Sequence, residues 1–287
     1  MTCEETLILD GAAKSKEIYK EIKTEVEKLN KEEEVVPRLS IIFVGDNPAS
    51  ASYIKLQQKV CTKVGIDSKV VNLPKNISQE GLLAELDKIN NDDSINGILI
   101  QLPLPAHIDD DKIIRKINPS KDLDSFHPYN IGELVIGGDA YIPCTPEGVM
   151  ALLDKYKIGV KGKDVTIIGH SNIVGKPMAL LLLNRNATVS VCHIDTKDTA
   201  KYTKKSDIVI VAAGVPNLIT ADMIKEGAVV IDVGINEVDG KIVGDVDFEN
   251  VKKKAAAITP VPGGAGPMTI AMLLKDTVKS CKNMLNK

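Results

Sequence analysis

The chain has 287 residues, a formal net charge of −3 and a hydrophobic fraction of 44%. This length predicts about two domains, and the balanced charge excludes a strongly basic surface for nucleic acid or an anionic membrane. The absence of Trp and the 3% of aromatic residues argue against base stacking. No apolar run reaches about 18 residues and the first residues lack a signal-peptide pattern, so we expect a cytoplasmic protein that acts on a small molecule.

The cysteines are scattered and form no C-x-x-C pair or Cys/His cluster. They are Cys3, Cys61, Cys144, Cys192 and Cys281. We therefore expect reduced thiols and no metal site.

The first half of the chain predicts helices that alternate with strands. The predicted helices cover 12–29, 49–64 and 82–89, and the predicted strands cover 39–44, 68–73 and 95–100. Strands separated by helices indicate a parallel sheet, in which ligands bind at the carboxyl ends of the strands. We therefore expect substrate contacts just after Val44 and Ile100.

The second half predicts a doubly wound nucleotide-binding domain. Between about 117 and 146 the pattern loosens, and a helix is expected to begin near Pro146. The strands predicted beyond this boundary cover 164–168, 187–192, 208–212 and 228–232. A final amphipathic helix over 267–287 has an apolar face with no local partner.

The most informative segment is Val165–Met178, VTIIGHSNIVGKPM. Apolar residues lead into Gly169, and a helical pattern begins after Gly175, which is how a βαβ unit directs backbone N–H groups at a pyrophosphate. Ser171 stands where the usual glycine pattern has its second glycine, so an ordinary strand-helix turn remains the alternative. Asp195, just past the next predicted strand, is placed to accept hydrogen bonds from an adenosine ribose.

Two segments in the first half end strands with polar residues. Gly45–Tyr53 directs hydroxyl groups and a phenol over the predicted crevice, and in Gly97–Pro105 Gln101 follows an apolar strand. A plain turn and a capping glutamine are the respective alternatives.

Two further segments have an unusual composition. Lys121–His127 places Asp122 and Asp124 on one side of an irregular segment, where a carboxylate could bind an amidine-like edge or simply face water. Thr259–Thr269 combines three prolines and three glycines, which indicates a close approach to a partner rather than a linker.

Together these segments resemble the methylenetetrahydrofolate dehydrogenase/methenyltetrahydrofolate cyclohydrolase family nearly from end to end. The matching stretches read VGDNPAS-x-x-Y, GILIQLPLP, P-x-KDLD-x-FHPYN, GHSNIVGKPM, DVGIN and TPVPGGAGPMT. The resemblance implies an α/β fold with an N-terminal folate domain over 1–144, joined by the C-terminal helix 267–287. It also implies a Rossmann-type dinucleotide-binding domain over 145–266, and a homodimer with folate in the cleft.

The resemblance further implies roles for individual residues. Tyr53 is expected against the pterin and p-aminobenzoate of the folate, Gln101 beside the one-carbon unit with Leu102 and Pro103, and Asp124 on the amino-pyrimidine edge. The loop between folate and nicotinamide would be Pro262, Gly263 and Gly264. The expected dinucleotide contacts are Gly169, His170, Ser171, Ile173, Val174, Ile194, Asp195, Ala213, Gly214, Gly234 and Ile235.

One departure from the family concerns catalysis. The family pattern is Y-x-x-x-K, with the lysine central to the cyclohydrolase step, but Gln57 stands in its place. Lys55 lies about 200° around a helix from Gln57, and Lys59 is also off that face. Hydride transfer needs only alignment, whereas hydrolysis needs a proton carrier, which an amide cannot be. We therefore expect the dehydrogenase step, with Tyr53, Gln57, Gln101 and Asp124 in the catalytic site, and a weak or absent cyclohydrolase step.

A second departure concerns the cofactor. NADP-using members resemble G-R-S at the first turn and carry a Ser and a basic residue after the second strand. This chain has His170 in place of the Arg, and Ile194 and Asp195 in place of the other pair. A carboxylate repels a 2′-phosphate but can bond a free 2′-hydroxyl, so NAD is favoured over NADP.

The sequence thus predicts an NAD-dependent dehydrogenase that oxidises 5,10-methylenetetrahydrofolate. The nearest alternative is the bifunctional NADP-dependent dehydrogenase/cyclohydrolase. Another class is a catalytically silent folate- or nucleotide-binding protein, which the retained Tyr53, Gln101 and Asp124 disfavour. A dehydrogenase of shikimate-like substrates would leave the Pro-Gly loop unexplained.

Overall fold

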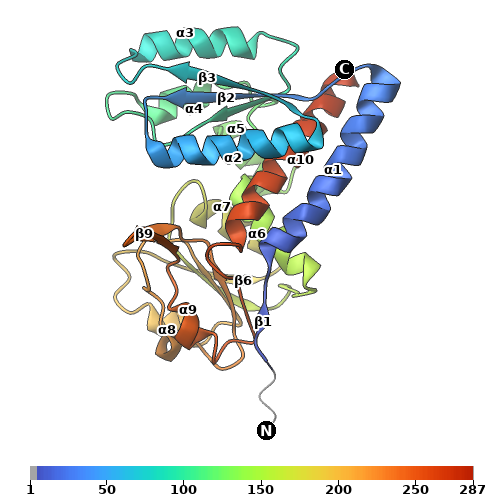
Figure 1. Cartoon of the computed structure of the whole chain (residues 1–287). Coiled ribbons are helices and arrows are strands. Elements are labelled where there is room, and N and C mark those ends of the chain that lie inside the picture. The colour runs from blue at the N-terminus through green and yellow to red at the C-terminus, as the bar shows by residue number, and fades with distance from the viewer. Residues whose placement is uncertain (1–4, 287) are drawn as a thin grey trace. The chain divides into compact units, whose positions relative to one another are not determined.

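A computed structural model describes residues 5–286, which divide into two compact units (Figure 1). Unit 1 contains the described residues up to Lys16 together with Pro143–Thr269, and unit 2 contains Glu17–Ile142 and the chain from Ile270 onward. The divisions fall inside α1 (Gly11–Glu33) and α10 (Ala265–Leu285). Each unit is an α/β structure built on a parallel sheet, as the sequence predicts.

Unit 1 is built on a sheet of six strands in the order β1-β11-β8-β7-β5-β6, with every pairing parallel. The strands are β1 (Leu7–Ile8), β5 (Asp164–Ile168), β6 (Thr188–Cys192), β7 (Ile208–Val211), β8 (Val229–Asp232) and β11 (Ala257–Ile258). The direction of strand order reverses at β5, since β6 lies on one side of it and β7 on the other. In such sheets the ligand crevice lies at this reversal, outside the carboxyl ends of the strands.

The helices of unit 1 that lie between its strands are short, apart from α6 and α7. They are α6 (Cys144–Lys155), α7 (Gly175–Asn184), α8 (Ala200–Thr203), α9 (Phe248–Val251) and the 3₁₀ turn Ala221–Met223. A two-stranded hairpin of β9 (Asn236–Val238) and β10 (Lys241–Val243) completes the unit. Strand β7 (IVIV) is buried along its whole length, which is typical of a parallel strand covered on both faces.

Unit 2 is built on a parallel sheet of three strands in the order β3-β2-β4. Its elements are β2 (Arg38–Val44), α2 (Pro48–Val64), β3 (Asp67–Leu73), α3 (Gln79–Asn90), β4 (Gly97–Ile100), α4 (Asp110–Lys116) and α5 (Pro128–Ile136). One side of the sheet packs Ile42 and Ile98 against Leu82 and Leu86 of α3. The carboxyl ends of β2 and β4 are adjacent because Gln101 N donates to the Ile42 carbonyl at 2.9 Å.

Several short elements are absent from the sequence prediction, among them β1 and α5. Strand β1 pairs with β11 and brings the first described residues into unit 1. It has only two residues, which is too short to show a hydrophobic pattern in the sequence. Helix α5 lies in the segment expected to be irregular. Its nine residues are set by end signals rather than by periodicity: His127 caps the first turn, Pro128 follows it, and Gly137 ends the helix with a left-handed conformation.

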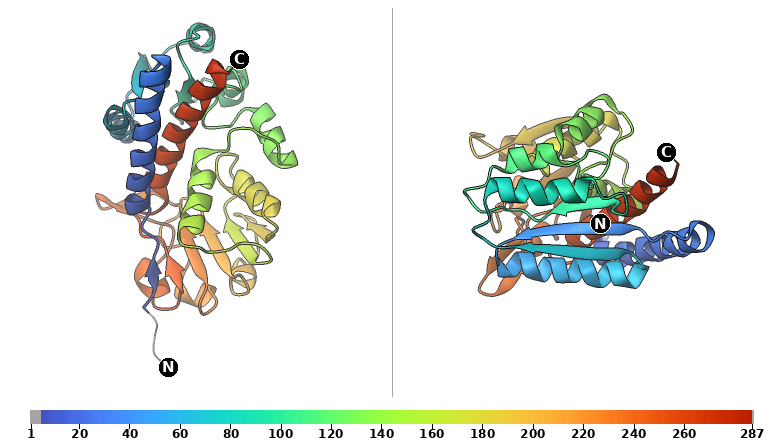
Figure 2. Two further views of the ribbon diagram at one scale, coloured as in Figure 1. Left: turned by 90° about the vertical axis from the view of Figure 1, so that its right-hand side faces the viewer. Right: turned by 90° about the horizontal axis from the view of Figure 1, so that it is seen from above.

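The C-terminal helix α10 forms as predicted, although Lys287 lies outside the described residues. From Ile270 onward it belongs to unit 2, where Ser280 Oγ donates to the Asn96 carbonyl at 2.6 Å and Lys282 pairs with Glu25 at 2.8 Å. The unit 2 parts of α1 and α10 lie side by side, as two views show (Figure 2). Within residues 5–286 no helix is long and apolar enough to span a membrane.

Candidate functional site

The turn after β5 forms a compact cradle at the start of α7. Gly169 has a φ of +113°, and a Cβ added there would lie 2.1 Å from the Ala212 carbonyl oxygen. A Cβ at Gly175 would lie 2.1 Å from the Gly169 carbonyl oxygen. Ser171 Oγ accepts a hydrogen bond from Val174 N at 3.1 Å, so the serine supports the turn. Glycine is therefore required at both positions, and the helix N-terminus fits a pyrophosphate.

His170, His193 and Asp195 gather at the ends of β5 and β6. Gly169 N donates to the Cys192 carbonyl at 2.8 Å, which brings the two strand ends together. The imidazole centroids of His170 and His193 are 4.8 Å apart, and His193 Nδ1 lies 3.7 Å from Asp195 Oδ2. The Asp195 side chain is 86% exposed, as required of a group that binds a ribose hydroxyl. Sequence reasoning missed His193, although it directly precedes Ile194 in the motif.

Exposed aliphatic side chains follow the carboxyl ends of β5, β6 and β8. Ile194 is 94% exposed, and Ile173 and Ile235 are also exposed. Large apolar side chains in such numbers at one sheet edge suit the packing of flat aromatic rings. Val174 is half-buried at the start of α7.

The Pro-Gly loop in unit 1 packs against the beginning of α1. Ala12 N donates to the Gly263 carbonyl at 2.9 Å, and a Cβ on Gly11 would lie 1.9 Å from the Gly264 carbonyl oxygen. Gly264 is buried, whereas Pro262 is exposed. The loop is thus held by backbone contacts and not free as a linker would be.

In unit 2, α2 carries Tyr53 and Gln57. Asn47 caps this helix by accepting from Ala49 N at 3.0 Å and Ser50 N at 3.1 Å, and Pro48 follows as its first residue. Tyr53 is half-buried. Gln57 is only 2% exposed, and its Oε1 has no hydrogen-bond partner among the described residues.

The lysines near Gln57 are exposed, as their helical positions predict. Neither Lys55 nor Lys59 shares the buried face of α2 with Gln57. Position 57 is therefore the buried polar position of this helix, and it carries an amide instead of an amine.

Gln101 directly follows β4, and the segment that contains Asp124 runs beside this strand. Gln101 Nε2 donates to the Leu102 carbonyl at 3.0 Å, and the bond from Leu102 to Pro103 is cis. Ile98 N donates to the Lys121 carbonyl at 2.7 Å, so the KDLD segment runs beside β4. Asp124 is half-buried, two residues after this attachment.

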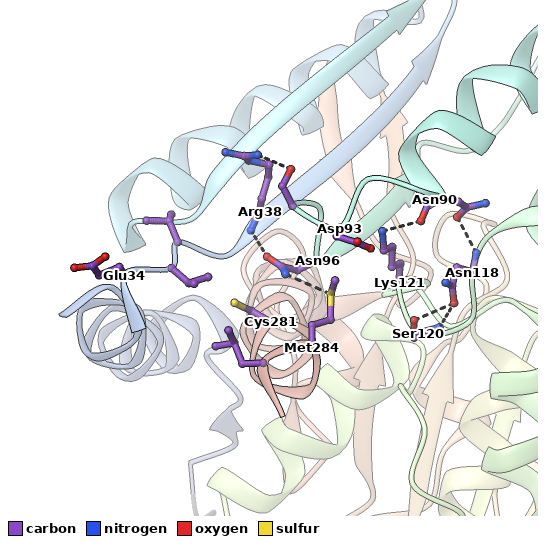
Figure 3. Close-up of a pocket in the computed structure, with 14 residues that line it drawn as sticks. Glu34, Arg38, Asn90, Asp93, Asn96, Asn118, Ser120, Lys121, Cys281 and Met284 are labelled. Carbon is purple, nitrogen blue, oxygen red and sulfur yellow. Dashed lines mark hydrogen bonds between the residues drawn. The ribbon is translucent and has the colours of Figure 1, made fainter. Parts of the chain in front are cut away.

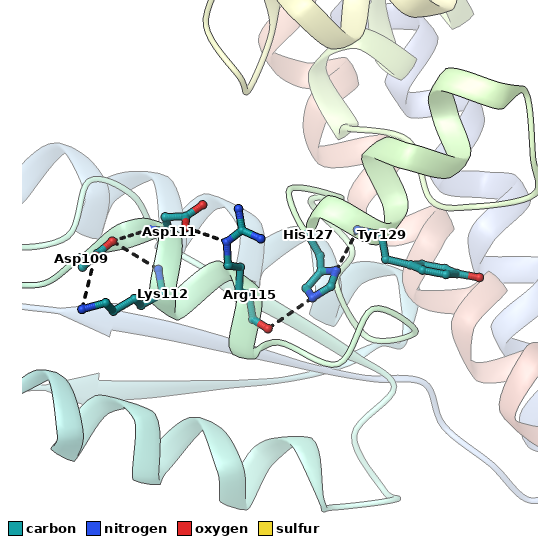
Figure 4. Close-up of polar contacts among 6 residues, drawn as sticks. All are labelled: Asp109, Asp111, Lys112, Arg115, His127 and Tyr129. Carbon is teal, nitrogen blue, oxygen red and sulfur yellow. Dashed lines mark hydrogen bonds and ion pairs between the residues drawn. The ribbon is translucent and has the colours of Figure 1, made fainter.

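Asp122 serves the fold, in contrast to the sequence expectation that placed it with Asp124. It is buried, and its Oδ2 accepts from His127 N at 2.8 Å and from Asn130 Nδ2 at 3.1 Å. Burial raises the pKa of this carboxyl, and the hydrogen bonds oppose the rise. His127 Nδ1 in turn accepts from Tyr129 N at 3.1 Å (Figure 4). Asp122 thus anchors the entry to α5 and is not available to a ligand, whereas the half-buried Asp124 stays a predicted folate contact.

A pocket of about 680 Å³ lies at the opposite, amino ends of β2 and β4 (Figure 3). Its polar groups bond to one another: Asn96 Oδ1 accepts from Arg38 N at 2.7 Å, and Asn96 Nδ2 donates to Met284 Sδ at 3.4 Å. Lys121 Nζ donates to the carbonyls of Asn90 and Asp92, each at 2.8 Å. This pocket is therefore part of the scaffold, since ligands of parallel sheets bind at the carboxyl ends.

Comparison with known proteins agrees with the geometry of both units. Residues 9–124 match the profile of the tetrahydrofolate dehydrogenase/cyclohydrolase catalytic domain, and residues 143–285 match the profile of the NAD(P)-binding domain of the same proteins. The chain belongs to the tetrahydrofolate dehydrogenase/cyclohydrolase family. The family resemblance seen in the sequence is thereby confirmed, and with it an oxidoreductase of tetrahydrofolate one-carbon metabolism with a Rossmann-type NAD(P) domain.

Similar proteins cover nearly the whole chain. A relative named bifunctional protein FolD from Nitratiruptor sp. is 59% identical over 96% of this chain and 98% of its own length. A crystal structure of FolD from Campylobacter jejuni is 56% identical, with a TM-score of 0.95 over 97% of this chain and 99% of that one. A Trypanosoma brucei family structure, complexed with NADP and an inhibitor, is 40% identical, with a TM-score of 0.95 over 99% and 100% of the two chains.

Proposed function

We propose that this chain is a bifunctional enzyme that oxidises 5,10-methylenetetrahydrofolate with a nicotinamide dinucleotide and hydrolyses the methenyl product. The observation that carries this proposal is the 59% identity, over nearly both full lengths, to a relative named as bifunctional. We prefer this proposal to the monofunctional enzyme that the sequence predicts, because other bifunctional relatives are also more than half identical to this chain.

For the oxidation step the chain needs mainly to bind the folate and the dinucleotide and to align them for hydride transfer. The bound dinucleotide supplies the hydride acceptor. Gly169 and the N-terminus of α7 would hold its pyrophosphate, and Asp195 would bond a ribose hydroxyl. Asp124 would accept two hydrogen bonds from the amino-pyrimidine edge of the folate, and Gln101 would lie beside the carbon that reacts. No side chain needs to move a proton in this step.

A second candidate function differs from the first in the hydrolysis step. Water activation needs a group that carries a proton, and the buried amide of Gln57 cannot do so. Its unpartnered Oε1 can accept a hydrogen bond from water or folate. Such a bond can orient a water molecule but cannot remove a proton from it. This observation favours a dehydrogenase with little cyclohydrolase activity, working on the same substrate.

The cofactor preference we propose is NAD, supported by the exposed carboxylate of Asp195 beside two imidazoles. A 2′-phosphate near this carboxylate would be repelled, whereas a 2′-hydroxyl would be bonded. NADP, the ligand in the Trypanosoma brucei structure, is the alternative.

One assay tests these proposals together. Purified protein receives methylenetetrahydrofolate with NAD or NADP, and reduced cofactor, methenyltetrahydrofolate and formyltetrahydrofolate are measured separately. Reduced cofactor with enzyme-dependent formyl product supports the bifunctional enzyme. Methenyl product that accumulates and decays no faster than in buffer supports the second candidate. Binding of folate and dinucleotide without any turnover would contradict both.

A further inference from the structure

Two carboxylates are buried in unit 1 without a part in the proposed chemistry. Asp245 is fully buried, and Asp232 is 3% exposed. Aspartate is almost never buried to this extent unless hydrogen bonds compensate the loss of water. The partners of these two groups therefore indicate what they are for.

Asp245 holds the turn that follows β7. Its Oδ2 accepts from Ala213 N at 2.7 Å and from Gly214 N at 2.9 Å. Its Oδ1 accepts from Asn236 Nδ2 at 2.8 Å. Both amide groups of the turn thus point at one inward oxygen, while the other side of Gly214 is open, since a Cβ there would meet nothing within 4 Å.

Asp232 holds Asp245 and the turn that follows β8. Its Oδ1 accepts from Gly234 N and from Asp245 N, each at 3.0 Å, and its Oδ2 accepts from Val246 N at 2.9 Å. A Cβ on Gly234 would lie 2.2 Å from Asp245 Cγ, so the turn fits closely around the second carboxylate. The two aspartates therefore join the ends of two neighbouring strands of the sheet.

The same pair is connected to the strand that precedes the Pro-Gly loop. Asp232 N donates to Thr259 Oγ1 at 2.7 Å, and Thr259 is fully buried. Three segments predicted to border the cofactor thus depend on one buried hydrogen-bond network. Loops that bind ligands keep their affinity when such a network fixes them before the ligand arrives.

We propose that Asp232 and Asp245 are positioning residues that fix the Ala213–Gly214 and Gly234–Ile235 turns in the conformation that binds the dinucleotide. This inference rests on the proposed cofactor role of those turns. Neither aspartate needs to touch the ligand, because each acts through backbone N–H groups. The decisive property is the acceptor oxygen that Asp245 offers to Ala213 and Gly214.

The test compares dissociation constants of NAD and NADP, measured by titration calorimetry on the full chain, for three variants. Asp245→Ala leaves two buried N–H donors without an acceptor, so the dissociation constant should rise about tenfold or more. Asp245→Asn keeps one acceptor oxygen for both donors, and Asn236 can turn its amide to accept from the new NH₂ group, so affinity should stay close to wild type. Val230→Ala, a buried change in β8 away from the turns, should lower thermal stability without weakening binding.

A second pair of variants covers the case in which Asp245→Ala does not fold. Asn236→Asp places a carboxylate against Asp245 Oδ1 and should weaken dinucleotide binding. The double variant Asp245→Asn with Asn236→Asp should restore it, because the amide at position 245 then donates to the carboxylate at position 236 and still accepts from both N–H groups. Affinity for tetrahydrofolate should remain unchanged in every variant.

The outcomes separate this inference from the proposed function. Wild-type protein that binds neither dinucleotide would contradict the proposed function itself. Wild-type protein that binds, with Asp245→Ala or Asn236→Asp binding equally well, would overturn only the positioning role. A loss of affinity that Val230→Ala reproduces at the same loss of stability would also overturn it.

Discussion

Position 57 is the residue on which the two candidate functions differ. Under the second candidate function, Gln57→Lys should raise the rate of methenyltetrahydrofolate hydrolysis, because burial lowers the pKa of the new amine and makes it a proton carrier near neutrality. Proton transfer of this kind contributes on the order of 100-fold or more. The rate is followed by the loss of methenyltetrahydrofolate.

The adjacent Gln58→Lys serves as the matched control, since Gln58 does not lie on the buried face of α2. An equal gain in both variants, or none in Gln57→Lys, would show that the residue at position 57 does not limit the hydrolysis step.

Asp124 carries the prediction for folate recognition. Asp124→Ala should reduce kcat/KM for methylenetetrahydrofolate by the equivalent of about 2–5 kcal/mol, because the hydrogen-bonded edge of the ligand would lose its charged partner. Asp111→Ala is the control, since Asp111 is an exposed carboxylate paired with Arg115 at 2.6 Å (Figure 4). Steady-state kinetics at low folate concentration test this prediction. Near-normal turnover by Asp124→Ala would show that Asp124 does not bind the folate.

We expect the preference between NAD and NADP to depend on the charge at positions 170 and 195. His170→Arg combined with Asp195→Ser removes the carboxylate and adds a guanidinium, so preference should move toward NADP. A charge-assisted phosphate contact contributes roughly 1.5–3 kcal/mol. The ratio of kcat/KM for NADP and NAD measures the change. Wild-type protein that already prefers NADP would refute the argument from Asp195.

At the scale of elements, the turn between β5 and α7 is the most constrained part of unit 1. Gly175→Ala should abolish dinucleotide binding or prevent folding of this turn, because its Cβ would lie 2.1 Å from the Gly169 carbonyl oxygen. Gly159→Ala is a matched control, since a Cβ there meets nothing within 4 Å. Dissociation constants and circular dichroism of the two variants give the comparison, and equal binding by both would contradict the close fit.

The sequence predicts the long elements because burial and periodicity agree in them. Strand β5 has the predicted bounds Asp164–Ile168, and β2 differs from its prediction by one residue. The sequence analysis misses helix α5 because its nine residues are too few to show a clear helical periodicity of apolar residues. The buried role of Asp232 and Asp245 is missed for another reason: their partners are backbone N–H groups of distant segments, which side-chain patterns do not reveal.

At the scale of the whole molecule, the buried Asp232 makes stability depend on pH. Burial, followed by the charge of Asp245, raises the pKa of Asp232 from 3.8 to about 6, against the effect of three backbone hydrogen bonds. Because the pKa of Asp232 is higher in the folded than in the unfolded chain, its protonated form stabilises the fold. This contribution to the free energy of unfolding is fully present below about pH 4 and is lost as pH rises through about 6. The change amounts to roughly 3 kcal/mol.

Urea unfolding of wild type and Asp232→Asn between pH 4 and 8 tests this effect. The free energy of unfolding of wild type should fall relative to that of the variant as pH rises through 6. The difference between wild type and Val230→Ala should stay constant, because no ionisable group changes. A constant difference for Asp232→Asn as well would show that Asp232 titrates normally.

The pairing of β1 with β11 has a consequence for synthesis of the chain. Leu7 and Ile8 are synthesised long before their partners Ala257 and Ile258, and unit 2 needs the residues from Ile270 onward. Neither unit can be completed until these later residues have been made, so both depend on segments that are distant in the sequence. During that interval the exposed apolar segments of both halves are a target for chaperones.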